Sequence, residues 1–294
     1  MQPRRIYFLI VNYNSSELIR RLLDSLPVET IDNYQVIIIN NSPSDRQIQS
    51  LSNDSVTIIE ADDNLGFGKA CNLGLDWIYR QHQQAIVWLI NPDTYFDSVS
   101  NSKQLSPIKT AIAFFNRHSQ ISILGTTVYD SAGKITAAGG KFTPGTAALE
   151  IIATLPQDEQ VDFWLTDWVS GCSLLINLAN FSQCPSFDPR YFLYYEDLDF
   201  CLRYGQQEHK IAVTPLLKVG HDTSSITDRN LWRKYQHITK SYLIHIEKHG
   251  NLATFIITNL RMSLNTVRLL ILKPQQGWGK LIGIYHYWRE RLAG

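Results

Sequence analysis

The sequence predicts an α/β protein with a Rossmann-like, mostly parallel central sheet flanked by helices. Three observations support this: continuous apolar runs alternate with segments of helical periodicity, the runs are short enough to be strands, and each ends in polar residues. The runs that predict strands are 6–14, 34–42, 56–63 and 85–94. The segments between them that predict helices are 16–26, which follows Ser15 as a plausible N-cap, and 67–81.

The polar ends of the four predicted strands are expected to meet at one edge of the sheet. In parallel sheets, ligands bind beyond the carboxyl ends of the strands. The polar clusters are Asn12–Asn14, Asn40–Ser42, Asp62–Asn64 and Asn91–Asp93. Four separate segments therefore predict a single ligand-binding rim.

The pattern changes after residue 97. The chain is expected to form a helix at 106–118, a strand at 121–130, a hairpin or loop at 131–148, a strand at 167–177, a helix at 195–206 and a strand at 210–215. From residue 229 onward the periodicity is helical throughout. We therefore predict a main domain over 1–228 and a helical C-terminal extension over 229–294.

Charge divides along the same boundary. Residues 229–294 carry eleven Lys and Arg against two Glu, whereas 1–228 carry 16 basic and 25 acidic residues. The acidic front argues against nucleic acid as a ligand, and the basic, aromatic-rich extension predicts contact with an anionic membrane surface. No run of 18 apolar residues and no signal peptide is evident, so a cytoplasmic protein without a spanning helix is expected. The four cysteines have no metal-like spacing and are expected to be reduced thiols.

Two motifs at the predicted rim contain residues suited to binding a metal ion or a phosphate. The segment NPDT at 91–94 places Asp93 after a buried strand, where its carboxylate suits Mg²⁺ or Mn²⁺ bound to a diphosphate, although Asn-Pro-Asp is also typical of a turn. The loop NLGFGKACNLG at 64–74 places Gly66 and Gly68 before a helix, where backbone N–H groups can approach a phosphate. A close-packed turn from strand to helix explains the same glycines.

A third motif, FDPRYFLYYEDLDFCLR at 187–203, clusters Glu196, Asp197 and Asp199 among aromatic residues. Because these carboxylates repel one another, partial burial should raise the pKa of at least one of them. A carboxylate is a suitable general base for a sugar hydroxyl, but an acidic helix N-terminus is also favoured by the macrodipole. His221 follows the last predicted strand in a loop of small residues, and a lone histidine is most often structural.

In their order and spacing, these segments resemble glycosyltransferase family 2, in particular its bacterial rhamnosyltransferase-like members. The motifs that carry the resemblance run from residue 6 to about 225, in the order VNYN, INNS, NLGFGKACNLG, NPD, SGCSLLI, FLYYEDLDFCLR and GH. The resemblance implies the GT-A fold, with a nucleotide-binding half at 1–97 and an acceptor-binding half at 98–228. It also implies a nucleotide-diphosphate-sugar donor, a divalent cation (Mn²⁺ or Mg²⁺) and inversion at the anomeric carbon.

The resemblance also assigns roles to residues. It places Val11 and Tyr13 beside the nucleobase, together with Asn40, which stands where the family usually has an Asp. It places four residues in the donor-binding loop: Asn64, Gly66, Phe67 and Asn72. Asn91 and Asp93 match the family's DxD motif, with the first Asp replaced. Asp93 is thus the expected metal ligand, and Asn91 is expected to reach the ribose or a metal-bound water.

The remaining roles concern catalysis and the acceptor. Asp197 matches the family's base, Glu196 and Asp199 are expected to support it, and His221 matches a histidine that completes the metal site in several members. Trp168, Gly171 and Cys172 resemble the acceptor-side strand.

The sequence therefore predicts an inverting glycosyltransferase that uses a UDP- or dTDP-sugar, with rhamnose one candidate sugar. Its acceptor is expected to be a saccharide or lipid-linked saccharide in cell-surface polysaccharide synthesis, with peripheral attachment to the inner face of the cytoplasmic membrane. Two alternatives stay open. A catalytically silent nucleotide- or glycan-binding module is compatible with Asn40 and Asn91. A sugar nucleotidyltransferase would share the sheet and the metal, but VNYNSSELIR lacks the basic Gly-rich loop expected there. The sequence does not define the oligomeric state.

Overall fold

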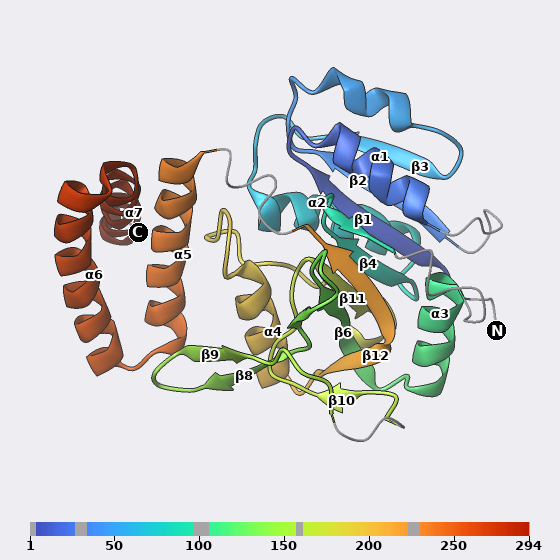
Figure 1. The fold of residues 1–294 in the computed structure, drawn as a ribbon. Helices are drawn as coiled ribbons and strands as arrows, with labels where there is room; N and C mark the ends of the chain where they lie inside the picture. The colour runs from blue at the N-terminus through green and yellow to red at the C-terminus, as the bar shows by residue number, and fades with distance from the viewer. Residues whose placement is uncertain (1–3, 27–33, 97–105, 157–160, 223–229, 294) are drawn as a thin grey trace.

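A computed structural model of the chain describes residues 4–26, 34–96, 106–156, 161–222 and 230–293. Its central feature is a twisted, mostly parallel sheet with helices on both faces, and three further helices follow at the C-terminal end (Figure 1). The predicted architecture is confirmed. The predicted boundaries at 97/98 and 228/229 lie outside the described residues, so the division into domains stays a prediction.

The first half of the chain forms the parallel part of the sheet. Its strands are β1 (Ile6–Asn12), β2 (Tyr34–Asn40), β3 (Val56–Glu60) and β4 (Ile86–Ile90). β1 lies between β2 and β4, and β3 follows β2, with all of these pairs parallel. Between the strands lie α1 (Ser16–Ser25), the 3₁₀-helix η2 (Arg46–Leu51) and α2 (Phe67–Gln81).

The second half of the chain completes the sheet. Its elements are β5 (Thr94–Tyr95), α3 (Pro107–Arg117), β6 (Ile121–Tyr129), β7 (Ile135–Ala137), β8 (Gly140–Thr143), β9 (Ala148–Ile151), β10 (Trp164–Leu165), β11 (Ser173–Asn177), the 3₁₀-helix η4 (Leu178–Asn180), α4 (Glu196–Gln206) and β12 (Lys210–His221). β11 is antiparallel to both β4 and β6, whereas β12 is parallel to β6. The resulting order is β10-β12-β6-β11-β4-β1-β2-β3.

Side-chain alternation along β1 explains why helices cover both faces of the sheet. Tyr7, Leu9 and Val11 enter the core beneath α2 and α4, whereas Phe8 and Ile10 enter the core beneath α1 and α3. Because both faces are covered, the strand is apolar at every position, which produced the continuous run in the sequence.

Three differences from the predicted elements have local causes. β12 is twice as long as the predicted strand 210–215, because an irregularity between Thr214 and Lys218 shifts its register and pairing resumes beyond it. The strand predicted at 167–177 is β11, which begins only at Ser173, and the preceding residues form a turn. The Gly/Thr-rich stretch 131–148 includes β7 and β8 and leads into a hairpin between β8 and β9.

The C-terminal helices are α5 (Leu231–His249), α6 (Leu252–Leu272) and α7 (Pro274–Ala293). α7 packs closely on α5 because two glycines face it: a Cβ at Gly279 would lie 2.3 Å from the Trp232 carbonyl oxygen, and one at Gly283 2.5 Å from that of Gln236. By length and composition α6 alone among the described helices meets the criterion for a membrane span. Arg261 and Arg268 interrupt the apolar run of α6, which is why the sequence does not predict a spanning helix there.

Candidate active site

The predicted rim borders a cavity of about 790 Å³. Its walls include Val11 and Tyr13 from the end of β1, Asn64 and Gly66 from the loop before α2, and Phe67 at the first position of that helix. The opposite side is formed by residues from the β4–β5 turn, the turn before β11, the start of α4 and the end of β12. Those residues include Asn91, Asp93, Gly171, Cys172, Glu196, Asp197 and His221. Twelve of the residues assigned from the sequence thus line one cavity, while their roles stay predictions.

Asp93 and His221 are brought together by strand pairing. The short β5, directly after Asp93, pairs antiparallel with the end of β12, so that Thr94 lies opposite His221. As a result, the Asp93 Oδ1 atom lies 3.2 Å from the His221 Nε2 atom. A Cβ on Gly220 would lie only 2.2 Å from the Tyr95 ring, so glycine is required for the two strands to pair this closely.

The pKa of His221 responds to this pairing. Burial by itself would lower the pKa of the imidazole, but the neighbouring Asp93 and Cys172 outweigh burial and raise it to about 10. No group of three His, Cys, Asp or Glu side chains suited to a metal ion occurs among the described residues. Asp93 and His221 thus form a close pair that lines the cavity, and their role as metal ligands stays a prediction.

Asp197 lies at the start of α4 with its carboxylate reaching the cavity. Its Oδ2 atom accepts the Gly171 N–H at 2.9 Å, and its Oδ1 atom accepts the Leu198 N–H at 2.8 Å. Glycine at position 171 permits this approach, since an added Cβ would lie 3.0 Å from the Asp197 Cβ atom. Burial raises the pKa of Asp197, although these hydrogen bonds and the nearby Trp168 partly offset the increase. A raised pKa makes a carboxylate a stronger base. Because Asp197 also lines the cavity, a ligand bound there can reach it.

Glu196 has a different environment although it precedes Asp197. Its side chain is buried, and its Oε2 atom has no hydrogen-bond partner in the described part of the chain. Burial, reinforced by the negative charge of Asp197, raises the pKa of Glu196 to about 8. The expectation that crowding raises at least one carboxyl pKa in this cluster is met. Both residues line the cavity, and with this pKa Glu196 is largely protonated at pH 7.

The turn before α4 has an unusual backbone conformation directly before Glu196 and Asp197. Tyr194 and Tyr195 both have left-handed backbone conformations, with φ of 71° and 68°, which non-glycine residues seldom adopt. Such strain is typical of functional sites. On the other side of the turn, Gly66 (φ 80°) approaches the Phe192 carbonyl so closely that a Cβ would lie 2.4 Å from its oxygen. The Phe67 N–H donates to the same oxygen at 2.8 Å. The glycine loop therefore has a packing role here, as the alternative reading of these glycines expected.

Three assigned residues lie outside the cavity wall. The Asn40 side chain accepts from Asn12 at 2.9 Å and donates to Glu60 at 2.8 Å, so both ends of its amide are bonded within the protein. Asn72 holds the backbone of Phe187 through two hydrogen bonds, and Trp168 is buried beside Asp197. The roles of these residues in ligand binding stay predictions.

Sequence reasoning missed several residues of the cavity wall. Asn41 lies in the wall where Asn40 does not, and its amide donates to Asn64 at 3.0 Å. The first turns of α5 also form part of the wall, through Trp232, Arg233 and His237 among others. The His237 ring stacks on Phe192, with ring centroids 4.5 Å apart. The excess of basic residues after position 229 was the available indication, but it was assigned only to a membrane surface.

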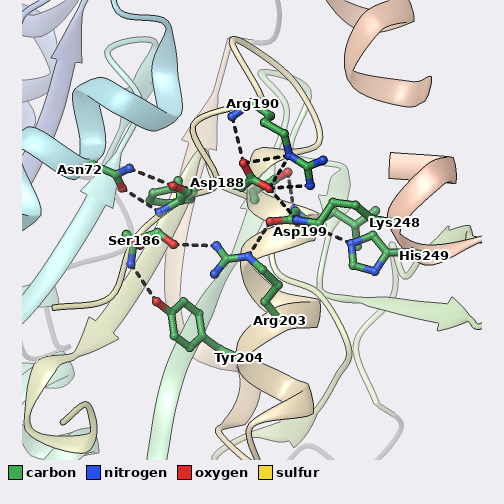
Figure 2. A network of polar contacts seen from close by, with 12 residues as sticks. Asn72, Ser186, Asp188, Arg190, Asp199, Arg203, Tyr204, Lys248 and His249 are labelled. Carbon is green, nitrogen blue, oxygen red and sulfur yellow. Dashed lines mark hydrogen bonds and ion pairs between the residues drawn. The ribbon is translucent and has the colours of Figure 1, made fainter. Parts of the chain in front are cut away.

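Asp199 also departs from its expected role as support for the base. It points away from the cavity and is fully buried, bonded to Arg203 at 2.7 Å, His249 at 3.0 Å and Lys248 (Figure 2). Lys248 also bonds Asp188 at 2.7 Å. Burial would raise the pKa of Asp199, but these cationic and hydrogen-bonding partners outweigh it and hold the pKa well below the usual range. Asp199 thus joins α4 to α5.

The family model and the relatives that match this chain all describe glycosyltransferases. Residues 7–129 match the family described as Glycosyl transferase family 2. The low-salt glycan biosynthesis hexosyltransferase Agl10 of Haloferax volcanii is 22% identical over 73% of this chain and 66% of its own length. The rhamnosyltransferase WbbL of Escherichia coli K12 is 20% identical over 74% of this chain and 83% of its own. The N-acetylglucosaminyl-diphospho-decaprenol L-rhamnosyltransferase of Mycobacterium tuberculosis is 26% identical over 82% of this chain and 83% of its own.

Solved structures share the fold. GalNAc-T7 with UDP, GalNAc and Mn²⁺ aligns with a TM-score of 0.58 and 14% identity over 84% of this chain, which spans about half (48%) of that protein. The mannosyltransferase PcManGT of Pyrobaculum calidifontis, in complex with GDP-Man and Mn²⁺, aligns with a TM-score of 0.54 and 12% identity over 97% of this chain and 85% of its own. The chain therefore resembles glycosyl transferase family 2 over residues 7–129, and it shares the GT-A fold of these solved structures.

Proposed function

We propose that this protein transfers a sugar from a UDP- or dTDP-sugar to a hydroxyl group of a saccharide or lipid-linked saccharide, with inversion at the anomeric carbon. The observation that carries the proposal is that Asp197 and the Asp93–His221 pair line the same cavity at the strand ends of a family 2 fold. Names of the bacterial relatives support rhamnose as one candidate sugar and cell-surface polysaccharide synthesis as the process.

Asp197 is the proposed general base. Its carboxylate reaches the cavity and is held by the Gly171 N–H, and its raised pKa suits proton abstraction. It takes the proton of the acceptor hydroxyl as that oxygen attacks the anomeric carbon and the bond to the leaving diphosphate breaks. One displacement inverts the centre, so no enzyme nucleophile is required. Glu196, protonated behind it, adds no second negative charge at neutral pH.

Asp93 and His221 fit a divalent cation as two of its ligands, and binding of the cation would displace the proton that Asp93 and Cys172 otherwise hold on the imidazole. A hard carboxylate oxygen and an imidazole nitrogen 3.2 Å apart face the cavity, and the buried Asn91 Oδ1 atom nearby has no hydrogen-bond partner among the described residues. Mg²⁺ and Mn²⁺ sites commonly use one or two protein ligands and complete their coordination with substrate phosphates and water. When bound, the cation would offset negative charge on the leaving diphosphate.

Different parts of the cavity wall are suited to different parts of the substrates. Val11 and Tyr13, at the end of β1, are the proposed contacts of the nucleobase, and Asn41 and Asn64 line the same cavity. Arg233 on α5 has no acidic partner in the described part of the chain and contributes positive charge to the wall near α4. A phosphate-bearing acceptor is therefore favoured, in line with the name of the mycobacterial relative. Such an acceptor implies a cytoplasmic enzyme that meets the inner face of the membrane.

A screen of nucleotide sugars tests this function. We expect release of the nucleoside diphosphate from one UDP- or dTDP-sugar with Mn²⁺ or Mg²⁺, and none with chelator. Asp93→Ala and His221→Ala should each weaken metal-dependent donor binding by at least about tenfold in titration calorimetry. A matched control is Asp130→Ala, which alters an exposed turn away from the cavity. Metal-independent nucleotide binding without turnover of any donor would instead indicate a silent binding module.

A further inference from the structure

The outer face of α6 carries a continuous apolar ridge. Its members are spaced three or four residues apart and are between 56% and 78% exposed: Leu252, Ile256, Leu260, Leu264, Val267 and Ile271. At 100° per residue they fall within a stripe of roughly 120°. The inner face of the same helix packs through Met262 and Thr266, the only buried residues of α6. Among the residues that the structure describes, nothing therefore covers the ridge.

Positive charge borders this ridge. Arg261 and Arg268 lie beside the stripe, and Lys273 follows its end. None of the three has an acidic partner among the described residues, and no acidic residue occurs between Lys248 and Arg289. The next acidic residue, Glu290, is already paired with Lys240 at 2.7 Å. Exposed Trp278 on α7 adds an aromatic side chain of the kind that favours membrane interfaces.

We propose that the α6 ridge rests in the surface of an anionic membrane, with the helix axis parallel to the bilayer plane. This location deepens the proposed function, because it would hold the cavity wall formed by α5 near a lipid-linked acceptor. α7 packs against both α5 and α6, which ties the ridge to that wall, and Figure 1 shows α6 at the end of the molecule away from the sheet.

The charges decide between this occupant and the alternatives. A second copy of the ridge would bring Arg261 and Arg268 against the same residues without a carboxylate to pair them, whereas anionic lipid headgroups supply the missing negative charge. A spanning orientation would place both arginines in hydrocarbon and would separate α6 from the helices it packs against. An amphipathic helix with an apolar stripe and basic edges is instead typical of in-plane binding.

Vesicle sedimentation tests the proposal with the full chain. Wild type should pellet with vesicles of phosphatidylcholine and 30 mol% phosphatidylglycerol, and much less with phosphatidylcholine alone. Replacing Leu260, Leu264 and Ile271 together by Gln should lower the partition coefficient by about 100-fold. Arg261→Gln with Arg268→Gln should lower it by about 30-fold at low salt and have little effect at high salt.

Matched controls alter equivalent side chains elsewhere. Leu165→Gln removes a leucine that is 63% exposed on β10, and Arg20→Gln with Arg21→Gln removes two exposed arginines on α1. Both controls should bind vesicles like wild type. Circular dichroism and donor binding check that each variant is folded.

Two results would overturn the proposal. Wild type that stays in the supernatant with anionic vesicles at low salt is one. The other is a wild-type dimer in light scattering that becomes a monomer in the ridge variant, which would make the ridge a self-association surface. The ridge variant should retain metal-dependent donor hydrolysis in solution. Failure of membrane binding is therefore distinguishable from failure of the proposed transfer reaction.

Discussion

The carboxylates in the first turn of α4 lie in two different environments, although they look equivalent in the sequence. On the side facing the cavity, Glu196 and Asp197 form no ion pair with a cationic side chain among the described residues, and burial raises their pKa values. Only two residues beyond Asp197, Asp199 is enclosed by Arg203, Lys248 and His249, and its pKa is lowered (Figure 2). The difference teaches that one acidic segment supplies both the proposed proton acceptor and an anchor for the C-terminal helices.

The largest expected effect falls on the cavity side. Asp197→Asn should reduce sugar transfer by about 10²–10⁴-fold, because loss of a general base typically costs that much. Donor binding, measured by titration calorimetry, should remain close to wild type, and so should the free energy of unfolding. Wild-type turnover in this variant would remove Asp197 from the role of base and erase the contrast with Asp199.

On the anchor side, the expected loss is in stability. Asp199→Asn leaves buried cations without their counter-charge and should lower the free energy of unfolding by about 3–5 kcal/mol at pH 7. Since the folded pKa of Asp199 is depressed, its stabilising effect is present above the unfolded pKa near 4 and is lost as the pH falls below it. The difference from wild type in urea unfolding should therefore shrink in acid. Equal stability of the two proteins at pH 7 would show that the network contributes nothing.

Glu196 provides a test with the opposite sign. Its folded pKa of about 8 lies above the unfolded value of 4.5, so wild-type stability should fall as the pH rises through this interval. Glu196→Gln avoids this loss and should be more stable than wild type by on the order of 3 kcal/mol at pH 8. Transfer at pH 7 should change little, since the neutral acid and the amide are similar in shape. A collapse of activity in Glu196→Gln would instead identify Glu196 as the base.

The smallest effect is expected at the exposed edge of the network. Arg190 bonds Asp188 at 3.1 Å, but its side chain is 50% exposed, whereas the Arg203 side chain that bonds Asp199 is 25% exposed. Arg190→Gln should lower the free energy of unfolding by less than about 1 kcal/mol, as is usual for surface ion pairs. Arg203→Gln, measured by the same urea unfolding, should cost several times more. Equal losses would mean that burial does not set the strength of this network.

Local pattern was sufficient for much of the fold but not for the roles within the acidic turn. The helix predicted at 67–81 is α2, and the predicted apolar strands are β1 to β4. These predictions succeeded because helical periodicity and continuous apolar runs are visible in short stretches of sequence. Most of the predicted site residues line one cavity for the same reason, since strand ends of a parallel sheet converge. By contrast, the fate of Asp199 depends on Lys248 and His249, about fifty residues away on α5.

Long-range contacts also explain the unexpected positions of Arg233 and Asn40. Arg233 enters the cavity wall only because α5 packs back onto the turn before α4, where the Ser241 hydroxyl donates to the Leu193 carbonyl at 2.8 Å. The Asn40 amide forms hydrogen bonds with Asn12 and Glu60 on the two neighbouring strands. The sequence alone does not show which strands are neighbours. Residue types predicted which chemistry is available, whereas long-range packing decided which member of each cluster faces the cavity.

The stereochemistry of the product tests the central claim most directly. Proton NMR of the transfer product, from the first donor that turns over, reports its anomeric configuration through the coupling constants at the anomeric centre. Asp197 acting as base in one displacement predicts a product with the configuration opposite to that of the donor. A product that retains the donor configuration would contradict the account, because it would require an enzyme nucleophile or another mechanism in place of the single displacement assigned to Asp197.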